Sequence, residues 1–264
     1  MKKIAFLFTG QSRCNPLSHN ANKQNIILDS YSKYIFTEEF KKKYEYDIFI
    51  STDDINIEKT INYFGKEHIK NIHLFNTNFI LNQNRKYNIP DIGYYIDKYN
   101  SYDKGECNPN VNSIHQQYKI RDAYNLLESY TDPNSYFLIF RIRLDIKFTA
   151  NFMETIIDIF ENNNILELIP GYDLFAAGKP RIMKEYCCGI DNKYGTYNPS
   201  NRNIEFKNFV IPYDIYNKLR FNEYHRWRYA PETQLFEVIF DYCDKNNVHV
   251  DTIVKPFHNC HIVR

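Results

Sequence analysis

The segment over residues 136–148 constrains the fold more than any other part of the chain. Its first five positions are all apolar, and the rest alternates apolar residues with charged ones, ending in Arg141-Ile142-Arg143-Leu144-Asp145-Ile146-Lys147-Phe148. A strand that begins apolar on both faces needs cover on both faces, as the buried strands of α/β proteins have. We therefore predict a strand over 136–148, in a mainly parallel sheet with helices on either side.

Other apolar runs of strand length alternate with helix-like stretches, which is the pattern of an α/β fold. Further strands are predicted over residues 3–9, 47–52, 71–75, 165–169 and 250–255. Helices are predicted over 57–64 and 113–130, and another begins at Pro231. Because the chain has no repeat and no clear linker, we predict one domain over residues 1–264.

Composition excludes several classes of function. The 8 glycines among 264 residues are isolated from one another, whereas a phosphate-cradling loop needs several close together. With a net charge of +1, the chain lacks the positive field that binds long polyanions or a membrane surface. We therefore expect no Gly-rich phosphate loop and no nucleic-acid partner.

The N-terminal residues and the cysteines bear on the compartment. Met1-Lys2-Lys3 and the apolar residues 4–8 resemble the start of a signal peptide, but the run is too short and predicts a first strand instead. No stretch approaches the roughly 20 apolar residues of a transmembrane helix. The 6 cysteines show no CxxC spacing, so reduced thiols are expected. We expect a soluble, cytoplasmic protein, in the host cytoplasm if the source is a virus.

Three predicted strands become polar where they end. They end in Thr9-Gly10-Gln11-Ser12-Arg13, in Ser51-Thr52-Asp53-Asp54 and in Arg141-Ile142-Arg143-Leu144-Asp145. In open α/β sheets the ligand lies outside the carboxyl ends of the strands, so these residues predict a binding site. The alternative is that polar residues merely end each strand.

The charged face of the 136–148 strand carries the strongest chemical signal. Arg141, Arg143 and Asp145 follow one another at two-residue spacing, about 6–7 Å a step. Guanidinium groups match phosphate oxygens, and a carboxylate suits a hard divalent cation. The segment therefore predicts a diphosphate site, and the alternative is a solvated face with Arg–Asp pairs.

These motifs, with a Tyr46-Asp47-Ile48-Phe49-Ile50-Ser51-Thr52 strand and a Gln116-Gln117-Tyr118-Lys119 helix, resemble small GT-A-fold glycosyltransferases. The chain is most similar to the polysaccharide-synthesis type of bacteria and large DNA viruses, in which Arg-x-Arg-x-Asp replaces Asp-x-Asp. The resemblance implies a GT-A-like, Rossmann-related fold with a nucleotide-binding half (1–150) and an acceptor-binding half (151–264). It also implies sugar transfer from a nucleotide-diphosphate sugar to a saccharide or glycan acceptor, with Mn²⁺ or Mg²⁺ as cofactor.

The resemblance and the strand ends together nominate the site residues. The donor-binding residues are Thr9, Gly10, Gln11, Arg13, Asp53, Gln116, Lys119, Arg141 and Arg143. Asp145 is the predicted metal ligand, assisted by a late histidine, His258 or His261. A zinc site at this His-x-x-His pair is weakly indicated because no second ligand pair accompanies it. For Lys119, the alternative is an ordinary solvated lysine.

The acceptor half supplies the other candidates. The resemblance implies that Glu232, at the start of the helix from Pro231, is the general base of an inverting transfer, with Asp173 as second choice. An ordinary helix start explains Pro231-Glu232 equally well. Lys179 and Trp227 are the predicted acceptor contacts, although Trp227 could equally be partly buried in the core.

Two other functions stay open on the same motifs. One is a noncatalytic carbohydrate-binding or structural protein on the same fold. The other is a sugar-phosphate nucleotidyltransferase, against which the lack of a Gly-rich first loop argues.

Overall fold

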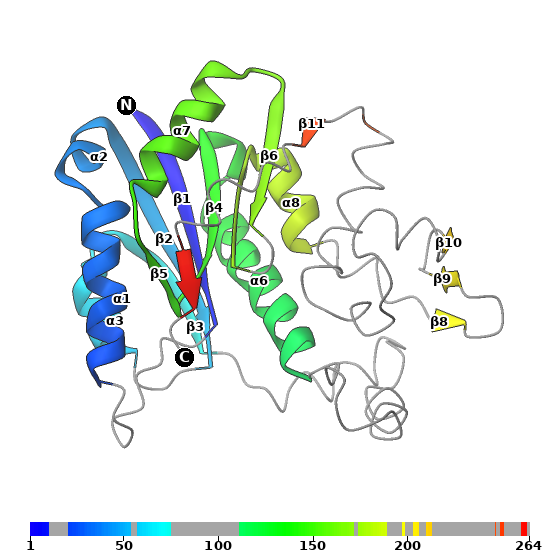
Figure 1. Ribbon diagram of the computed structural model, residues 1–264, viewed down its shortest axis with the longest axis horizontal. Coiled ribbons are helices and arrows are strands. Elements are labelled where there is room, and N and C mark those ends of the chain that lie inside the picture. The colour runs from blue at the N-terminus through cyan, green and yellow to red at the C-terminus, as the bar shows by residue number, and fades with distance from the viewer. Residues whose placement is uncertain are drawn as a thin grey trace.

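A seven-stranded mixed sheet forms the centre of the computed structural model (Figure 1). The structure describes residues 1–10, 21–53, 57–74, 111–171 and 174–188, with short stretches at 197–198, 203–205, 210–212, 246, 249–250 and 260–262. In sheet order the strands are β11 (His249–Val250), β6 (Leu166–Gly171), β7 (Phe175–Gly178), β4 (Leu138–Arg143), β1 (Lys2–Thr9), β2 (Tyr44–Thr52) and β3 (Ile69–Leu74).

Most neighbouring strands of this sheet are parallel. β1 pairs in parallel with β2 and β4, β2 with β3, and β11 with β6. Of the described strands in this sheet, only β7 runs the other way, antiparallel to both β4 and β6. The predicted mixed and mainly parallel α/β sheet is thus confirmed.

Helices cover both faces of the sheet (Figure 1). One face packs against α1 (Ala21–Tyr34), α2 (Glu38–Lys43), α3 (Glu58–Phe64) and α7 (Phe152–Asn162). The other packs against α6 (Val111–Tyr130) and α8 (Pro180–Cys188). The predicted helices over 57–64 and 113–130 are confirmed as α3 and α6, whereas the sequence analysis did not identify α1, α2, α7 or α8.

The alternation of side chains along β1 shows how the two layers form. Ile4, Phe6 and Phe8 enter the aromatic-rich layer beneath α1, while the smaller Ala5 and Leu7 face α6. All five are fully buried. The apolar residues after Met1-Lys2-Lys3 therefore form a central strand, as predicted.

The long strand predicted over 136–148 is wrong in one respect, because the structure divides it. A short 3₁₀ turn (Pro133–Ser135) leads to β4, and a turn at Leu144–Asp145 separates β4 from β5 (Ile146–Phe148). The neighbouring strand β1 ends at Thr9, whose carbonyl accepts the last sheet-type bond, from the Leu144 amide at 2.9 Å. Beyond that point the chain leaves the sheet, and the Phe148 amide donates to Ser30 Oγ of α1.

The remaining described strands are short. β5 pairs antiparallel with β12 (Cys260–Ile262). β8 (Tyr197–Asn198), β9 (Asn203–Glu205) and β10 (Val210–Pro212) form a separate antiparallel sheet. Of the strand predicted over 250–255, the structure describes only Val250, in β11, and the helix predicted from Pro231 lies outside the described residues.

Candidate functional site

Polar residues from four strands line up at the carboxyl edge of the sheet. The pairing register places Arg143 of β4 beside Thr9 of β1, Thr9 beside Ser51 of β2, and Ser51 beside His73 of β3. Neighbouring strands lie about 4.8 Å apart, so this row extends over about 14 Å. The strand ends that the sequence analysis singled out therefore meet at one edge.

Arg141 lies directly beneath this row and is completely buried. Its Nε donates to Thr9 Oγ1 at 3.1 Å. Burial raises the pKa of the nearby Cys187 thiol on α8, and the positive charge of Arg141 opposes that rise. The alternative of a solvated charged face is therefore wrong for Arg141, which lies between the sheet and its helices.

Arg143 and Asp145 form a two-point ion pair at the end of β4. Arg143 Nε and Nη2 donate to Asp145 Oδ1 and Oδ2, both at 2.8 Å. The Asp145 side chain is 4% exposed and that of Arg143 is 16% exposed. Tyr31 of α1 donates its hydroxyl to the Arg143 carbonyl oxygen at 3.0 Å, which fixes the strand end. The pair therefore stands in a defined orientation, with Arg143 the more accessible partner.

Lys119 of α6 joins the helix to the end of β2. Its Nζ lies 2.7 Å from Asp53 Oδ2, and the two side chains are 7% and 17% exposed. The stripe of Ile120, Ala123 and Leu127 packs α6 on the sheet, and this packing brings Lys119 over the strand ends. Lys119 is thus no ordinary solvated lysine, and Gln116, one turn earlier, is half-buried.

The chain turns sharply after β1 at Gly10. Its φ is +93°, a conformation that favours glycine, and its amide donates to the Ser51 carbonyl at 3.2 Å. Ser51 itself is fully buried, and its Oγ has no hydrogen-bond partner within the described part of the chain. Gly10 and Ser51 therefore present a turned backbone and a buried hydroxyl beside the row of charged residues.

The charges of this site nearly balance. Among the predicted donor and metal residues described here, the positive Lys119, Arg141 and Arg143 outnumber the negative Asp53 and Asp145 by one charge. The donors come from fixed secondary structure, which suits recognition of a compact anion such as a phosphate group.

The described residues do not by themselves make a metal centre. No group of three or more His, Cys, Asp or Glu side chains that could hold a metal ion occurs among them. The backbone of β12 places His261 opposite Lys147, two residues from Asp145 along β5. A single carboxylate such as Asp145 can still contribute to a Mg²⁺ site, because Mg²⁺ is commonly held by one or two carboxylates together with substrate phosphates.

The structure does not bring Lys179 to this edge. Because β7 is antiparallel to β4, its end at Gly178 lies opposite Ile139, near the amino end of β4. Lys179 follows there and is held by Glu167 and the Asn164 carbonyl. The other predicted site residues, Gln11, Arg13, Asp173, Trp227, Glu232 and His258, lie outside the described residues, and only the backbone of His261 is described.

Sequence reasoning missed one further pair at this edge. His73 Nδ1 lies 2.6 Å from Asp122 Oδ2. Asp122 is on α6, three residues after Lys119. The spacing of Lys119 and Asp122 along one helix face was a signal for Asp122. His73 could be placed only once the register of β3 was known.

The fold and the site together define an α/β protein with a polar, largely buried site at the carboxyl edge of a mainly parallel sheet. Among solved structures, the chain is similar to the apo form of mouse xyloside xylosyltransferase 1, with 12% sequence identity and a TM-score of 0.35. That match covers 97% of this chain and 80% of the other. No protein-family model matches the chain, and no curated protein matches its sequence. Among the described helices, none is long and apolar enough to cross a membrane.

Proposed function

We propose that this chain is a glycosyltransferase that moves a sugar from a nucleotide-diphosphate sugar to a saccharide acceptor. The observation that carries the proposal is the convergence of Lys119, Arg141 and Arg143 at the carboxyl edge of the sheet, where α/β proteins bind their ligands. The resemblance of the same segments to GT-A-fold enzymes supports the choice of donor.

The two arginines have different parts in this proposal. Arg143 retains some exposure and can offer its guanidinium group to the diphosphate. Arg141 has none, so it acts as a positioning residue that holds Thr9 and, through Thr9, the turn at Gly10. In this proposal, Lys119 and Gln116 contact the nucleotide from the α6 side.

A divalent cation fits this arrangement through Asp145. Each carboxylate oxygen has a second lone pair, so Asp145 can accept from Arg143 and still face a cation. Bound there, Mn²⁺ or Mg²⁺ would supply charge neutralisation for the departing diphosphate. His261 and His258 are the proposed further ligands, of which His261 is on the strand that pairs with β5.

The transfer itself needs an acceptor hydroxyl and a base. The hydroxyl oxygen forms a bond to the anomeric carbon of the donor sugar, the bond from that carbon to the diphosphate breaks, and the hydroxyl proton goes to a carboxylate. We assign that carboxylate to Glu232, or failing that Asp173, if the reaction inverts the anomeric centre. A well-placed base contributes about 10²–10⁴-fold to the rate. Trp227 is the proposed acceptor contact.

The test measures binding of UDP, GDP, ADP, CDP and TDP to the full chain by calorimetry, with and without Mn²⁺. We expect one of them to bind, and its sugar conjugates to release the diphosphate in the presence of acceptor. Arg143→Gln should weaken binding by at least about tenfold, the loss of one charge-assisted contact. Arg181→Gln is the matched control, since Arg181 is a 56% exposed arginine paired with Glu167 on another part of the molecule. Absence of binding by every diphosphate to the folded protein would overturn the proposal.

A further inference from the structure

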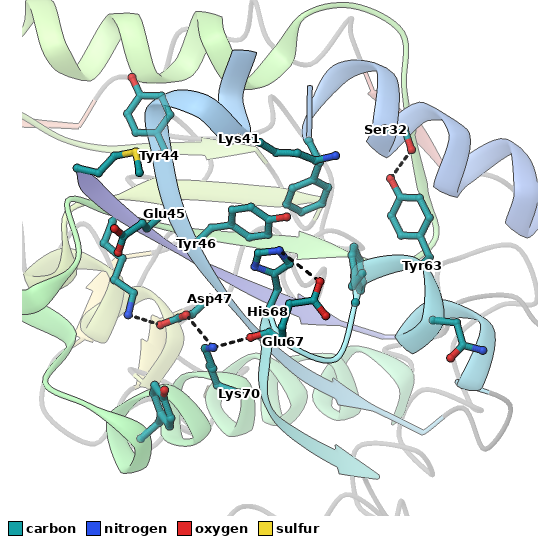
Figure 2. Close-up of a pocket in the computed structure, with 17 residues that line it drawn as sticks. Ser32, Lys41, Tyr44, Glu45, Tyr46, Asp47, Tyr63, Glu67, His68 and Lys70 are labelled. Atoms are coloured by element: carbon teal, nitrogen blue, oxygen red, sulfur yellow. Dashed lines mark hydrogen bonds and ion pairs between the residues drawn. The ribbon is translucent and has the colours of Figure 1, made fainter. Parts of the chain in front are cut away.

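A pocket lies at the amino ends of β1 and β2, the opposite end of these strands from the candidate donor site. Figure 2 shows this pocket in close-up. It has a volume of about 750 Å³ and is lined by the first residues of β2, by the segment between α3 and β3, and by side chains of α1 and α2. That volume is within the range of small-molecule sites, about 300–1,000 Å³. The stretch of β2 from Tyr46 to Thr52, at about 3.3 Å a residue, separates this pocket from the carboxyl edge by about 20 Å.

The inner part of the pocket is aromatic. Phe36, Tyr46 and Phe64 line it and are almost completely buried. The His68 ring stacks on Tyr46 with centroids 4.1 Å apart and an interplanar angle of 17°. Tyr63 lies on the side of the pocket formed by α1 and α3, where its hydroxyl pairs with Ser32 Oγ at 2.7 Å (Figure 2). Stacked rings with polar edges offer a flat apolar surface beside hydrogen-bonding groups.

The rim of the pocket carries charges of both signs in equal number. Three lysines and three acidic residues line it: Lys3, Lys41, Lys70, Glu45, Asp47 and Glu67. Asp47 is fixed by Lys3 at 2.6 Å and Lys70 at 3.6 Å, and Lys70 also donates to the Glu67 carbonyl oxygen at 2.6 Å. A pocket with no net charge on its acidic and basic side chains favours neither a polyanion nor a polycation.

Burial makes the phenols of Tyr46 and Tyr63 harder to ionise. Burial raises the pKa of Tyr46 to about 12, and the nearby Glu67 and Glu38 add to the effect. Burial likewise raises the pKa of Tyr63 to about 12. Both hydroxyls therefore remain hydrogen-bond donors beside carboxylate acceptors and ammonium donors.

We propose that this pocket binds a neutral oligosaccharide. The apolar face of a pyranose ring fits against the outer face of the His68 ring, which is itself stacked on the buried Tyr46. The sugar hydroxyls meet the exposed donors and acceptors of the rim, among them Lys41, Glu45 and Glu67. An uncharged, polyhydroxylated ligand is the kind of molecule that can use both the aromatic surface and the rim of mixed charge. The inference does not rest on sugar transfer at the carboxyl edge, and it gives the chain a saccharide site distinct from any acceptor contact there.

Binding is tested with the full chain and a probe set of maltopentaose, cellopentaose and chitopentaose, with a hyaluronan tetrasaccharide as the acidic probe. Saturation-transfer NMR identifies the probe that binds, and calorimetry measures its affinity. We expect a neutral probe to bind, and His68→Ala to weaken it by about tenfold through loss of the stacked ring. His73→Ala is the matched control, because His73 is an exposed histidine at the other end of β3, and it should leave the affinity unchanged.

Arg143→Gln separates this inference from the proposed function. It should weaken nucleotide-diphosphate binding by about tenfold or more while leaving the oligosaccharide affinity intact. His68→Ala should weaken oligosaccharide binding and leave diphosphate binding intact. Tyr63→Phe, which removes only the hydroxyl bonded to Ser32, is a milder second variant in case His68→Ala does not fold. The inference is overturned if no neutral probe binds, if only the acidic probe or a nucleotide binds, or if His68→Ala and Tyr63→Phe fold and bind as the parent does.

Discussion

Lys119 of α6 and Asp53 at the end of β2 form an ion pair with Nζ 2.7 Å from Oδ2, largely withdrawn from solvent. The pair joins the helix that covers one face of the sheet to the edge where four strand ends meet. A charge at such a place is compensated by its partner rather than by water, so each member depends on the other.

Replacing Lys119 tests that dependence. We expect Lys119→Met to lower the free energy of unfolding by about 3 kcal/mol, because it removes the ammonium group that pairs with the Asp53 carboxylate in a poorly solvated place. Urea denaturation measures the loss.

Lys184 provides the comparison for Lys119. It lies at the same 2.7 Å from Glu128, on the same side of the sheet, but the two side chains are 55% and 43% exposed. Lys184→Met should therefore cost less than about 1 kcal/mol. Equal costs for the two variants would show that burial does not set the contribution of the Lys119–Asp53 pair.

Asp47 supports a second test, at the other end of β2. Its 4% exposed carboxylate accepts from the Tyr136 hydroxyl at 2.6 Å and pairs with Lys3 and Lys70. Asp47→Asn removes the charge that both lysines face, and we expect it to cost about 3 kcal/mol of unfolding free energy. Tyr136→Phe removes one hydrogen bond and should cost about 1.5 kcal/mol. Denaturant unfolding of both variants should give this order, and a larger loss from Tyr136→Phe would contradict it.

Local pattern was enough to predict most of the sheet. The alternation of apolar and charged residues along β4 is real: Phe140 and Ile142 enter one layer, and Ile139 and Arg141 lie on the other face. It could not show the turn at Leu144–Asp145, because the alternation continues unbroken across it. β4 ends because its neighbour β1 ends at Thr9 and, among the described residues, offers no further backbone partner beyond the Leu144 amide. Which strands are neighbours is decided only when the sheet assembles.

The candidate site was predictable as a set of residues but not as a set of contacts. The strand ends and the resemblance to GT-A-fold enzymes nominated Thr9, Asp53, Lys119 and Arg141 separately. That Lys119 pairs with Asp53, and that Arg141 is buried against Thr9, depends on register and helix packing. His73 escaped notice for the same reason, since nothing near it in the chain indicates which α6 residue it meets.

Several buried tyrosines make stability depend on pH in the alkaline range. Burial, helped by nearby acidic groups, raises the pKa of Tyr46 to about 12, and burial raises that of Tyr63 to about 12. In the unfolded chain both titrate near about 10. Between these values the unfolded state has lost protons that the folded state keeps, so the free energy of unfolding falls as pH rises.

The expected loss approaches about 1.4 kcal/mol per pH unit for each such tyrosine. Urea unfolding at a series of pH values above neutrality measures it, with tyrosinate absorbance as an independent record of ionisation. Tyr63→Phe should make the fall of the unfolding free energy with pH less steep. Tyr34→Phe, at a half-buried position on α1, is the comparison variant and should change that slope less. An unchanged slope in Tyr63→Phe would contradict the assignment.

The Arg143–Asp145 pair separates the contributions of arginine and metal to diphosphate binding. Both Asp145 oxygens accept hydrogen bonds from Arg143, so the two side chains hold each other in place. In the proposed function, Arg143 contacts the diphosphate and Asp145 contacts the metal. Arg143→Gln should weaken binding of the diphosphate that the chain selects by about tenfold or more, with and without Mn²⁺, because the lost contact is direct. Asp145→Asn should remove only the gain in affinity that Mn²⁺ brings.

Calorimetric titrations of the diphosphate into the parent chain and each variant, in chelator and then in Mn²⁺, give the six affinities needed. Asparagine can still accept one bond from Arg143, so the arginine stays near its place in Asp145→Asn and the metal-free affinity should change little. A full Mn²⁺ gain in Asp145→Asn would exclude Asp145 as the metal ligand, and an unchanged affinity in Arg143→Gln would remove the arginine from the diphosphate site.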